Sequence, residues 1–191
     1  MLRSILLATL VFITASQTLL AQRAREGAKA PEISGVTLLN SDQETVTLAS
    51  LEGKVVILEF WATWCGPCVQ TAHYLDELQT SMGDKLQIVS LSDESKSEVS
   101  TFLRRRPSSA MVGVYEGSAV SSAYPHSAIP HGILIGPDGT VVKIDHPMTF
   151  TQSMIEQVFN GTYGNASSSE GGGTRDWETL SGRNSVKPGG E

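Results

Sequence analysis

Positive charge and cysteine are both scarce in this sequence. Its 191 residues include 14 lysines and arginines against 20 aspartates and glutamates, for a net charge of −6, and only two cysteines. The acidic balance removes the usual electrostatic reason to expect nucleic acid or an anionic membrane surface as a partner. The one basic cluster, Arg104 to Arg106, is short and typical of a solvated helix end rather than of a binding patch.

The chain also lacks an apolar run of the roughly 20 residues that a membrane-spanning helix requires. It begins instead with one early cation, Arg3, an apolar run from Ile5 through Ile13, and then small and polar residues up to Ala21. This order predicts a secretory signal peptide over residues 1–21. We therefore expect an exported protein in the periplasm or cell envelope, held at the membrane only if this segment is not cleaved.

The rest of the chain divides into a predicted domain and a predicted tail. The composition, 40% hydrophobic and 18% charged, is that of a chain that can bury a core, and we assign residues 22–161 to one domain. Residues 162–191 consist mainly of glycine, serine and charged residues. Such a segment buries too little apolar surface to offset its ordering entropy, so we expect it to be disordered.

Strand and helix patterns alternate within residues 22–161. Val36–Leu39 and Val46–Leu48 predict a β-hairpin ahead of the main sheet, and the apolar run Lys54–Phe60 predicts a central strand buried on both faces. The further predicted elements are a helix from Cys65 to Gly83, a strand at 86–91, a helix from Ser95 to before Pro107, a strand at 110–115, a short helix at 118–124, two strands around a turn at 136–139, and a last helix capped by Thr149 and ending at Gly161. The fold class is α/β, with a mixed central sheet.

Both cysteines lie in the stretch FWATWCGPC, as Cys65 and Cys68. A disulfide closed over two intervening residues removes little entropy from the unfolded chain, so a purely structural role is a poor explanation. Cys65 falls at the predicted start of a helix, where the helix dipole and free N–H groups favour a thiolate. Cys65 is therefore the predicted nucleophile, and Cys68, one turn later, can resolve a mixed disulfide.

Two further features of this stretch refine the prediction. Gly66 and Pro67 add no charge or imidazole that would stabilise the thiolate, which favours a reducing or exchanging role over strong oxidation. Glu59 interrupts the apolar central strand six residues before Cys65. A carboxylate buried there should have a raised pKa and could accept the proton of Cys68.

Three other functions compete with this one. The four histidines, His73, His126, His131 and His146, could join the cysteines in a metal site, but they lack the paired spacing of structural zinc sites. A thiol peroxidase would use Cys65 through a sulfenate, although Gly-Pro between the cysteines suits disulfide exchange better. A non-catalytic binding module would use the disulfide only to stiffen a loop.

The stretch EFWATWCGPC resembles the active-site strand and turn of thioredoxins, and the segment from Gly27 to Cys65 resembles exported TlpA/ResA-like thiol-disulfide oxidoreductases of the redoxin type. AIPHGILIGPDGTVV is similar to the later segment of that family that holds its cis-proline loop and hairpin. The resemblance implies a thioredoxin-like fold in which helices flank the sheet, and it places Glu59 where thioredoxins carry a buried acid.

The same resemblance makes Pro130 the expected cis-proline, with the backbone of Ile129 free to pair with a substrate segment. Trp64, Gly66 and Pro67 complete the expected substrate-contacting set. It implies no cofactor beyond the redox-active Cys65–Cys68 pair. Its expected partners are protein thiols and disulfides as substrates and a membrane or periplasmic redox protein upstream.

Overall fold

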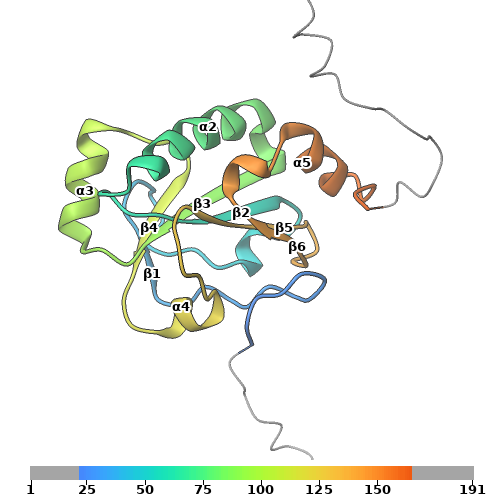
Figure 1. Ribbon diagram of the computed structural model, residues 1–191, viewed down its shortest axis with the longest axis horizontal. Coiled ribbons are helices and arrows are strands. Elements are labelled where there is room, and N and C mark those ends of the chain that lie inside the picture. The colour runs from blue at the N-terminus through green and yellow to red at the C-terminus, as the bar shows by residue number, and fades with distance from the viewer. Residues whose placement is uncertain (1–21, 165–191) are drawn as a thin grey trace, which may run out of the picture.

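The apolar run at the predicted central strand forms β2 (Val55–Phe60), and every residue of it is buried. In the computed structural model, which describes residues 22–164, β2 lies inside a six-stranded sheet of order β1-β4-β3-β2-β5-β6 (Figure 1). It pairs in parallel with β3 (Leu86–Ser92) and antiparallel with β5 (His131–Ile135). Both faces of a strand in this position are covered, which explains why all its residues except Glu59 are hydrophobic.

The remaining elements follow the predicted alternation of strands and helices. The other strands are β1 (Val36–Leu38), β4 (Met111–Tyr115) and β6 (Val141–Asp145). The helices are α2 (Gly66–Met82), α3 (Lys96–Arg105), α4 (Ala119–Ala123) and α5 (Gln152–Phe159), with short 3₁₀ turns at η1 (Ala49–Leu51), η2 (Gly83–Lys85) and η3 (Pro147–Thr149). The predicted α/β class with a mixed sheet is thus confirmed.

The two faces of the sheet are covered by different helices. α2 and α5 lie over one face and α4 lies over the other (Figure 1). Side chains of a strand alternate between faces, so Val55 and Ile57 pack under α2 and α5, whereas Val56 and Leu58 pack on the side of α4. Glu59 continues the series of Val55 and Ile57, which directs its carboxyl group toward the α2 side.

The predicted hairpin is wrong in its second strand. Residues 36–38 do form a strand, but β1 pairs antiparallel with β4, and Val46–Leu48 forms no strand. The carboxylate of Glu32 accepts the N–H groups of Leu48, at 2.6 Å, and Ala49, at 3.3 Å, so these amides are already satisfied outside a ladder. An alternation of apolar and polar residues over only three positions indicates which side chain is buried, here Val46. It does not show whether the segment pairs with a strand, or with which one.

The helix caps match the predictions in one case and differ in another. Ser95 and Glu98 form the predicted capping box of α3. The last helix is capped by Thr151, whose hydroxyl oxygen accepts the N–H of Met154 at 3.2 Å, and not by Thr149. Thr149 instead ends the η3 turn, because Pro147 starts a separate turn ahead of the helix.

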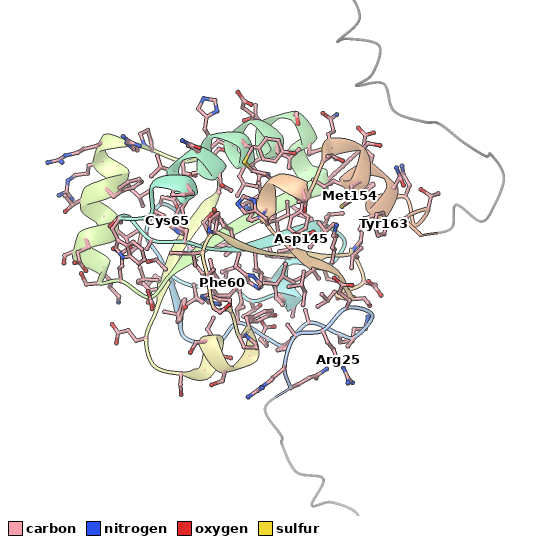
Figure 2. The ribbon with its side chains drawn as sticks, in the orientation of Figure 1. Arg25, Phe60, Cys65, Asp145, Met154 and Tyr163 are labelled. Carbon is pink, nitrogen blue, oxygen red and sulfur yellow. A yellow bond between two sulfur atoms is a disulfide. The ribbon has the colours of Figure 1, made fainter. Side chains whose placement is uncertain are left out.

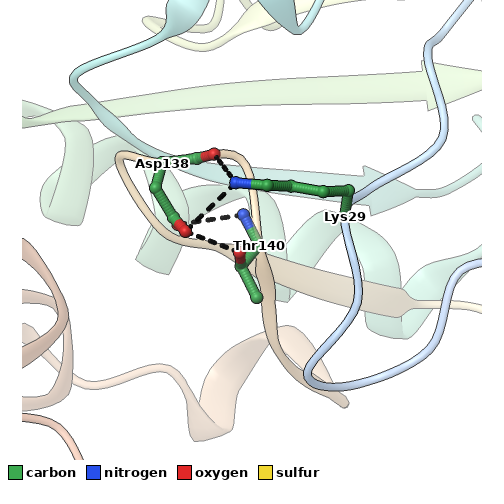
Figure 3. Close-up of polar contacts among 3 residues, drawn as sticks. All are labelled: Lys29, Asp138 and Thr140. Atoms are coloured by element: carbon green, nitrogen blue, oxygen red, sulfur yellow. Dashed lines mark hydrogen bonds and ion pairs between the residues drawn. The ribbon is translucent and has the colours of Figure 1, made fainter.

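An ion pair fastens the N-terminal segment to the turn between β5 and β6. The ammonium group of Lys29 lies 3.2 Å from Asp138 Oδ2, and the backbone and hydroxyl of Thr140 also donate to Asp138 (Figure 3). These bonds from Thr140, together with Lys29, lower the pKa of Asp138 to about 2. The segment before β1 is thereby held along the edge of the sheet, where Lys29 and Thr140 form a β-bridge.

The two terminal predictions fall largely outside the described part of the chain. The predicted signal peptide, residues 1–21, and residues 165–191 of the predicted tail lie outside the described residues. Within residues 22–164 there is no helix of the length and apolar character needed to cross a membrane.

Candidate active site

Cys65 and Cys68 form a disulfide at the start of α2, with a Cα–Cα distance of 5.2 Å (Figure 2). Cys65 is the N-cap residue of the helix, and its sulfur accepts the N–H of Cys68 at 3.2 Å. Pro67 occupies the first turn, where its missing N–H costs no hydrogen bond. The sequence therefore places one sulfur of the pair at the helix N-terminus, where the helix dipole favours negative charge.

The two sulfur-bearing residues differ in their access to solvent. Cys65 is 5% exposed, whereas Cys68 is completely covered. Cys68 packs in a cluster with Val99 of α3 and Val112 of β4. Of the two cysteines, Cys65 is therefore the nearer to the surface.

The loop that leads into Cys65 is anchored from β3. The carboxylate of Glu94 accepts the backbone N–H of Thr63 at 2.7 Å and its hydroxyl at 2.6 Å, and it also accepts the hydroxyl of Ser92 at 3.0 Å. Trp64, by contrast, projects into solvent and is 76% exposed. The loop thus combines a fixed backbone with an exposed apolar side chain beside Cys65.

A second loop closes the other side of the site. The Ile129–Pro130 peptide bond is cis, as the resemblance implies, and the carbonyl oxygen of Ile129 lies 3.9 Å from the sulfur of Cys65. The loop continues directly into β5, which pairs with β2. The sheet therefore brings residues 65 and 129, which are far apart in the sequence, into contact.

Glu59 lies in the interior of the protein, as predicted. It is 1% exposed, and its Oε2 accepts the hydroxyl of Ser90, the residue opposite it on β3, at 2.6 Å. Its pKa is raised to about 7, first by burial and further by the carboxylate of Asp76, while the Ser90 hydrogen bond acts in the other direction. A group that titrates near neutrality can accept and release protons under physiological conditions.

Two supporting residues, Ser90 and Glu94, were missed from the sequence. Ser90 is a polar residue inside the apolar strand LQIVSLS, which is the same signal that singled out Glu59. Its pairing with Glu59 depends on the register of β2 and β3, which a single sequence does not reveal. Nothing in the sequence singled out Glu94 as a site residue, because it follows the strand in an ordinary polar loop.

Three of the four histidines, His126, His131 and His146, line one pocket together with Pro130. His126 and His131 stack on each other with ring centres 5.4 Å apart, and His126 also lies 4.6 Å from the ring of Phe60. Burial, and then the neighbouring His126, lower the pKa of His131. Among the described residues, no three or more histidine, cysteine or acidic side chains are grouped so that they could hold a metal ion.

Comparisons with known proteins agree with this geometry. The family model described as Redoxin matches residues 25–158. The thiol-disulfide oxidoreductase ResA of Bacillus subtilis is 33% identical over 137 residues, which cover 71% of this chain and 74% of that protein. The thioredoxin-like protein YneN of the same organism is 29% identical over 137 residues, which cover 70% of this chain and 78% of YneN.

Solved structures show the same fold. The thioredoxin domain of a thiol-disulfide oxidoreductase from Bacteroides vulgatus superposes with a TM-score of 0.61 at 22% identity, covering 70% of this chain and 96% of that one. A thiol:disulfide interchange protein from Chlorobium tepidum gives a TM-score of 0.60 at 22% identity, covering 71% and 98%. These likenesses establish the predicted thioredoxin-like fold. With the family match and the Cys65–Cys68 disulfide, they lead to one conclusion: the chain belongs to the redoxin family, as a thiol-disulfide oxidoreductase.

Proposed function

We propose that the protein is an exported disulfide reductant, which exchanges the Cys65–Cys68 dithiol with disulfides of protein substrates. The difference in exposure between the two cysteines carries this proposal: Cys65 reaches solvent and Cys68 does not. An incoming disulfide meets Cys65 first. Cys68 then acts only on a sulfur that is already joined to Cys65.

The reaction proceeds in two steps. The thiolate of Cys65 attacks one substrate sulfur, the substrate S–S bond breaks, and the other substrate sulfur leaves as a thiolate. Cys68 then gives its proton to the carboxylate of Glu59 and attacks the sulfur of Cys65, which releases the second substrate thiolate. Two electrons pass from the protein to the substrate, and the Cys65–Cys68 disulfide forms.

Backbone and apolar contacts would hold the substrate. The carbonyl of Ile129, 3.9 Å from the sulfur of Cys65, lies where an extended substrate segment can pair with it, and cis-Pro130 directs this loop toward the site. The exposed ring of Trp64, together with Gly66 and Pro67, offers an adjoining surface. Because these contacts are made by backbone and apolar groups, they accept many sequences around the substrate disulfide.

The reducing direction and the location rest on the sequence. Gly66 and Pro67 leave the Cys65 thiolate without an additional cation, which limits the stability of the dithiol form and favours electron donation. The signal-like residues 1–21 support export to the periplasm or envelope. There, a membrane or periplasmic redox protein would return the disulfide to the dithiol.

The test is reduction of insulin disulfides in the presence of dithiothreitol. We expect activity in the wild type and in Ser121→Ala, an exposed control on α4, and loss of activity in Cys65→Ser. Cys68→Ser should instead accumulate a mixed disulfide with the substrate. A reduction potential near the value of thioredoxin, about −270 mV, would support a reductant, and one near about −120 mV would contradict it. Rapid hydroperoxide consumption without insulin reduction would favour a peroxidase instead.

A further inference from the structure

A cavity of about 250 Å³ lies between α2, α3 and the sheet, on the face toward which Glu59 points. Its inner wall includes Glu59, Trp61 and Ser90, and Ala72 of α2 and Phe102 of α3 form its sides. Four polar residues also line the cavity, on its side toward the protein surface: His73, Asp76, Arg106 and Ser108. The cavity therefore joins the buried carboxyl group to the solvent-facing side of α2.

Two polar atoms in this wall have no hydrogen-bond partner. Within residues 22–164, Glu59 Oε1 and Trp61 Nε1 are the buried side-chain polar atoms left unpaired. Glu59 is 1% exposed and Trp61 is 7% exposed, so bulk solvent does not satisfy either atom. A buried polar atom without a hydrogen-bond partner is unfavourable, and two of them on one cavity point to an occupant that pairs with both.

The chemistry of the two atoms defines that occupant. The indole N–H of Trp61 only donates, and the carboxylate oxygen of Glu59 accepts when ionised. The occupant must therefore accept from Trp61 and donate to Glu59, which a water molecule does. A water molecule takes about 30 Å³ of liquid volume, so the cavity has room for several in a row.

We propose that this cavity holds a chain of water molecules that solvates Glu59 and carries its proton to solvent, with Trp61 as a positioning residue for the innermost water. This inference rests on the proposed function and deepens it. The proton that Glu59 takes from Cys68 in the resolving step passes along the water chain to a buffer base at the mouth of the cavity. The carboxylate is restored for the next cycle, and no redox change accompanies this transfer.

The first test detects the water directly in the wild-type full chain. We expect a long-lived water cross-peak at the indole N–H of Trp61 in a rotating-frame NMR experiment, assigned by its loss from the spectrum of Trp61→Phe. If the assigned Trp61 indole shows no such cross-peak, the cavity is dry and the proposal is overturned. The cross-peak itself is measured on the unchanged protein, and Trp61→Phe serves only to assign the indole signal.

The second test fills the cavity and separates the two chemical steps. The reduced protein reacts with 5,5′-dithiobis(2-nitrobenzoic acid) in two phases, because Cys65 releases one coloured thiolate and Cys68 the other. We expect Ala72→Leu, which occupies part of the cavity, to leave the first phase unchanged and to slow the second about fivefold at pH 7. A rise of about one unit in the pKa of Glu59 from about 7 would lower its ionised fraction at pH 7 by that factor. Ala72→Ser, which keeps the space, should match the wild type in both phases.

The outcomes separate this inference from the proposed function. An unchanged second phase in a folded Ala72→Leu protein overturns the water route while the exchange chemistry stands. A wild type that reacts in the first phase but never releases the second thiolate, and does not reduce insulin, overturns the proposed function. Equal slowing of both phases in Ala72→Leu would indicate a general distortion of the site, and it would also overturn the specific role of the cavity.

Discussion

Ser90 lies directly opposite Glu59 in the parallel pair of β2 and β3, and its hydroxyl donates a 2.6 Å hydrogen bond to Glu59 Oε2. This bond supports the ionised form of a carboxyl group that burial holds toward the neutral form. Burial and this hydrogen bond act in opposite directions and leave Glu59 with a pKa of about 7, which suits the role proposed for it as the acceptor of the Cys68 proton.

Glu59 should make stability depend on pH. Its pKa is about 7 in the folded protein against 4.5 ordinarily, so between these values the folded state binds the extra proton. Stability from this carboxyl group is complete below pH 4.5 and is lost as pH rises toward 7, by up to about 3 kcal/mol. Glu59→Gln, which stays neutral, should therefore be the more stable protein at pH 8 and lose that advantage at pH 4. Urea unfolding of the oxidised proteins at both pH values checks this, and an advantage independent of pH would contradict it.

Glu94 should matter for both stability and the reactivity of Cys65. Its carboxylate holds the backbone and hydroxyl of Thr63, just before the cysteine. We expect Glu94→Ala to cost about 2 kcal/mol, because charged hydrogen bonds of this kind are lost, and to slow alkylation of Cys65 in the reduced protein. Glu116→Ala removes an exposed carboxylate after β4 and serves as the control. Equal alkylation rates in Glu94→Ala and Glu116→Ala would show that the anchor does not position the cysteine.

His131 should weaken the protein in acid. Burial and His126 lower its pKa from the ordinary 6.5, so below that pH the unfolded chain binds a proton that the folded protein does not. The contribution is fully favourable above pH 6.5 and is lost as pH falls below it. His131→Asn should therefore show a smaller fall in urea midpoint between pH 7.5 and pH 5 than the wild type. His73→Asn, at an exposed position of α2, should fall as the wild type does. If the urea midpoint of His131→Asn fell between pH 7.5 and pH 5 as much as that of the wild type, His131 would not be the cause of the loss of stability in acid.

Even a methyl side chain at Gly132 should destabilise the protein. It lies opposite Glu59 on β5, and a Cβ there would come within 2.7 Å of the ring of Phe150 and 3.0 Å of the carbonyl oxygen of Asp145. Phe150 is fully buried and Asp145 contributes backbone from the adjacent strand, so neither moves freely. We expect Gly132→Ala to cost about 1–3 kcal/mol in urea unfolding. Gly66→Ala, where a Cβ meets nothing within 4 Å, provides the matched comparison, and equal stability of the two variants would refute the steric argument.

Local patterns in the sequence were sufficient for the elements of the active site. The largely apolar run of β2, the change to helical spacing after Cys65 and the Gly-Pro pair between the cysteines all act within a few residues, so they predicted the strand and the helix that begins at the cysteine pair. The role of Cys65 as the attacking sulfur stays a prediction. The position of Glu59 within this apolar run also predicted that it is buried, as it is. These features depend on periodicity and helix ends, which a single sequence displays.

Contacts between distant segments were decided only by the tertiary structure. The register of β2 and β3 places Ser90 opposite Glu59, and the carboxylate of Glu94 accepts the backbone N–H of Thr63. β1 pairs with β4 and not with residues 46–48, which the sequence had predicted as its partner. The cavity that joins Glu59 and Trp61 likewise exists only because α2 and α3 pack over the same part of the sheet. Such relationships depend on which strands pair and how helices pack on them, and no spacing along one chain specifies either.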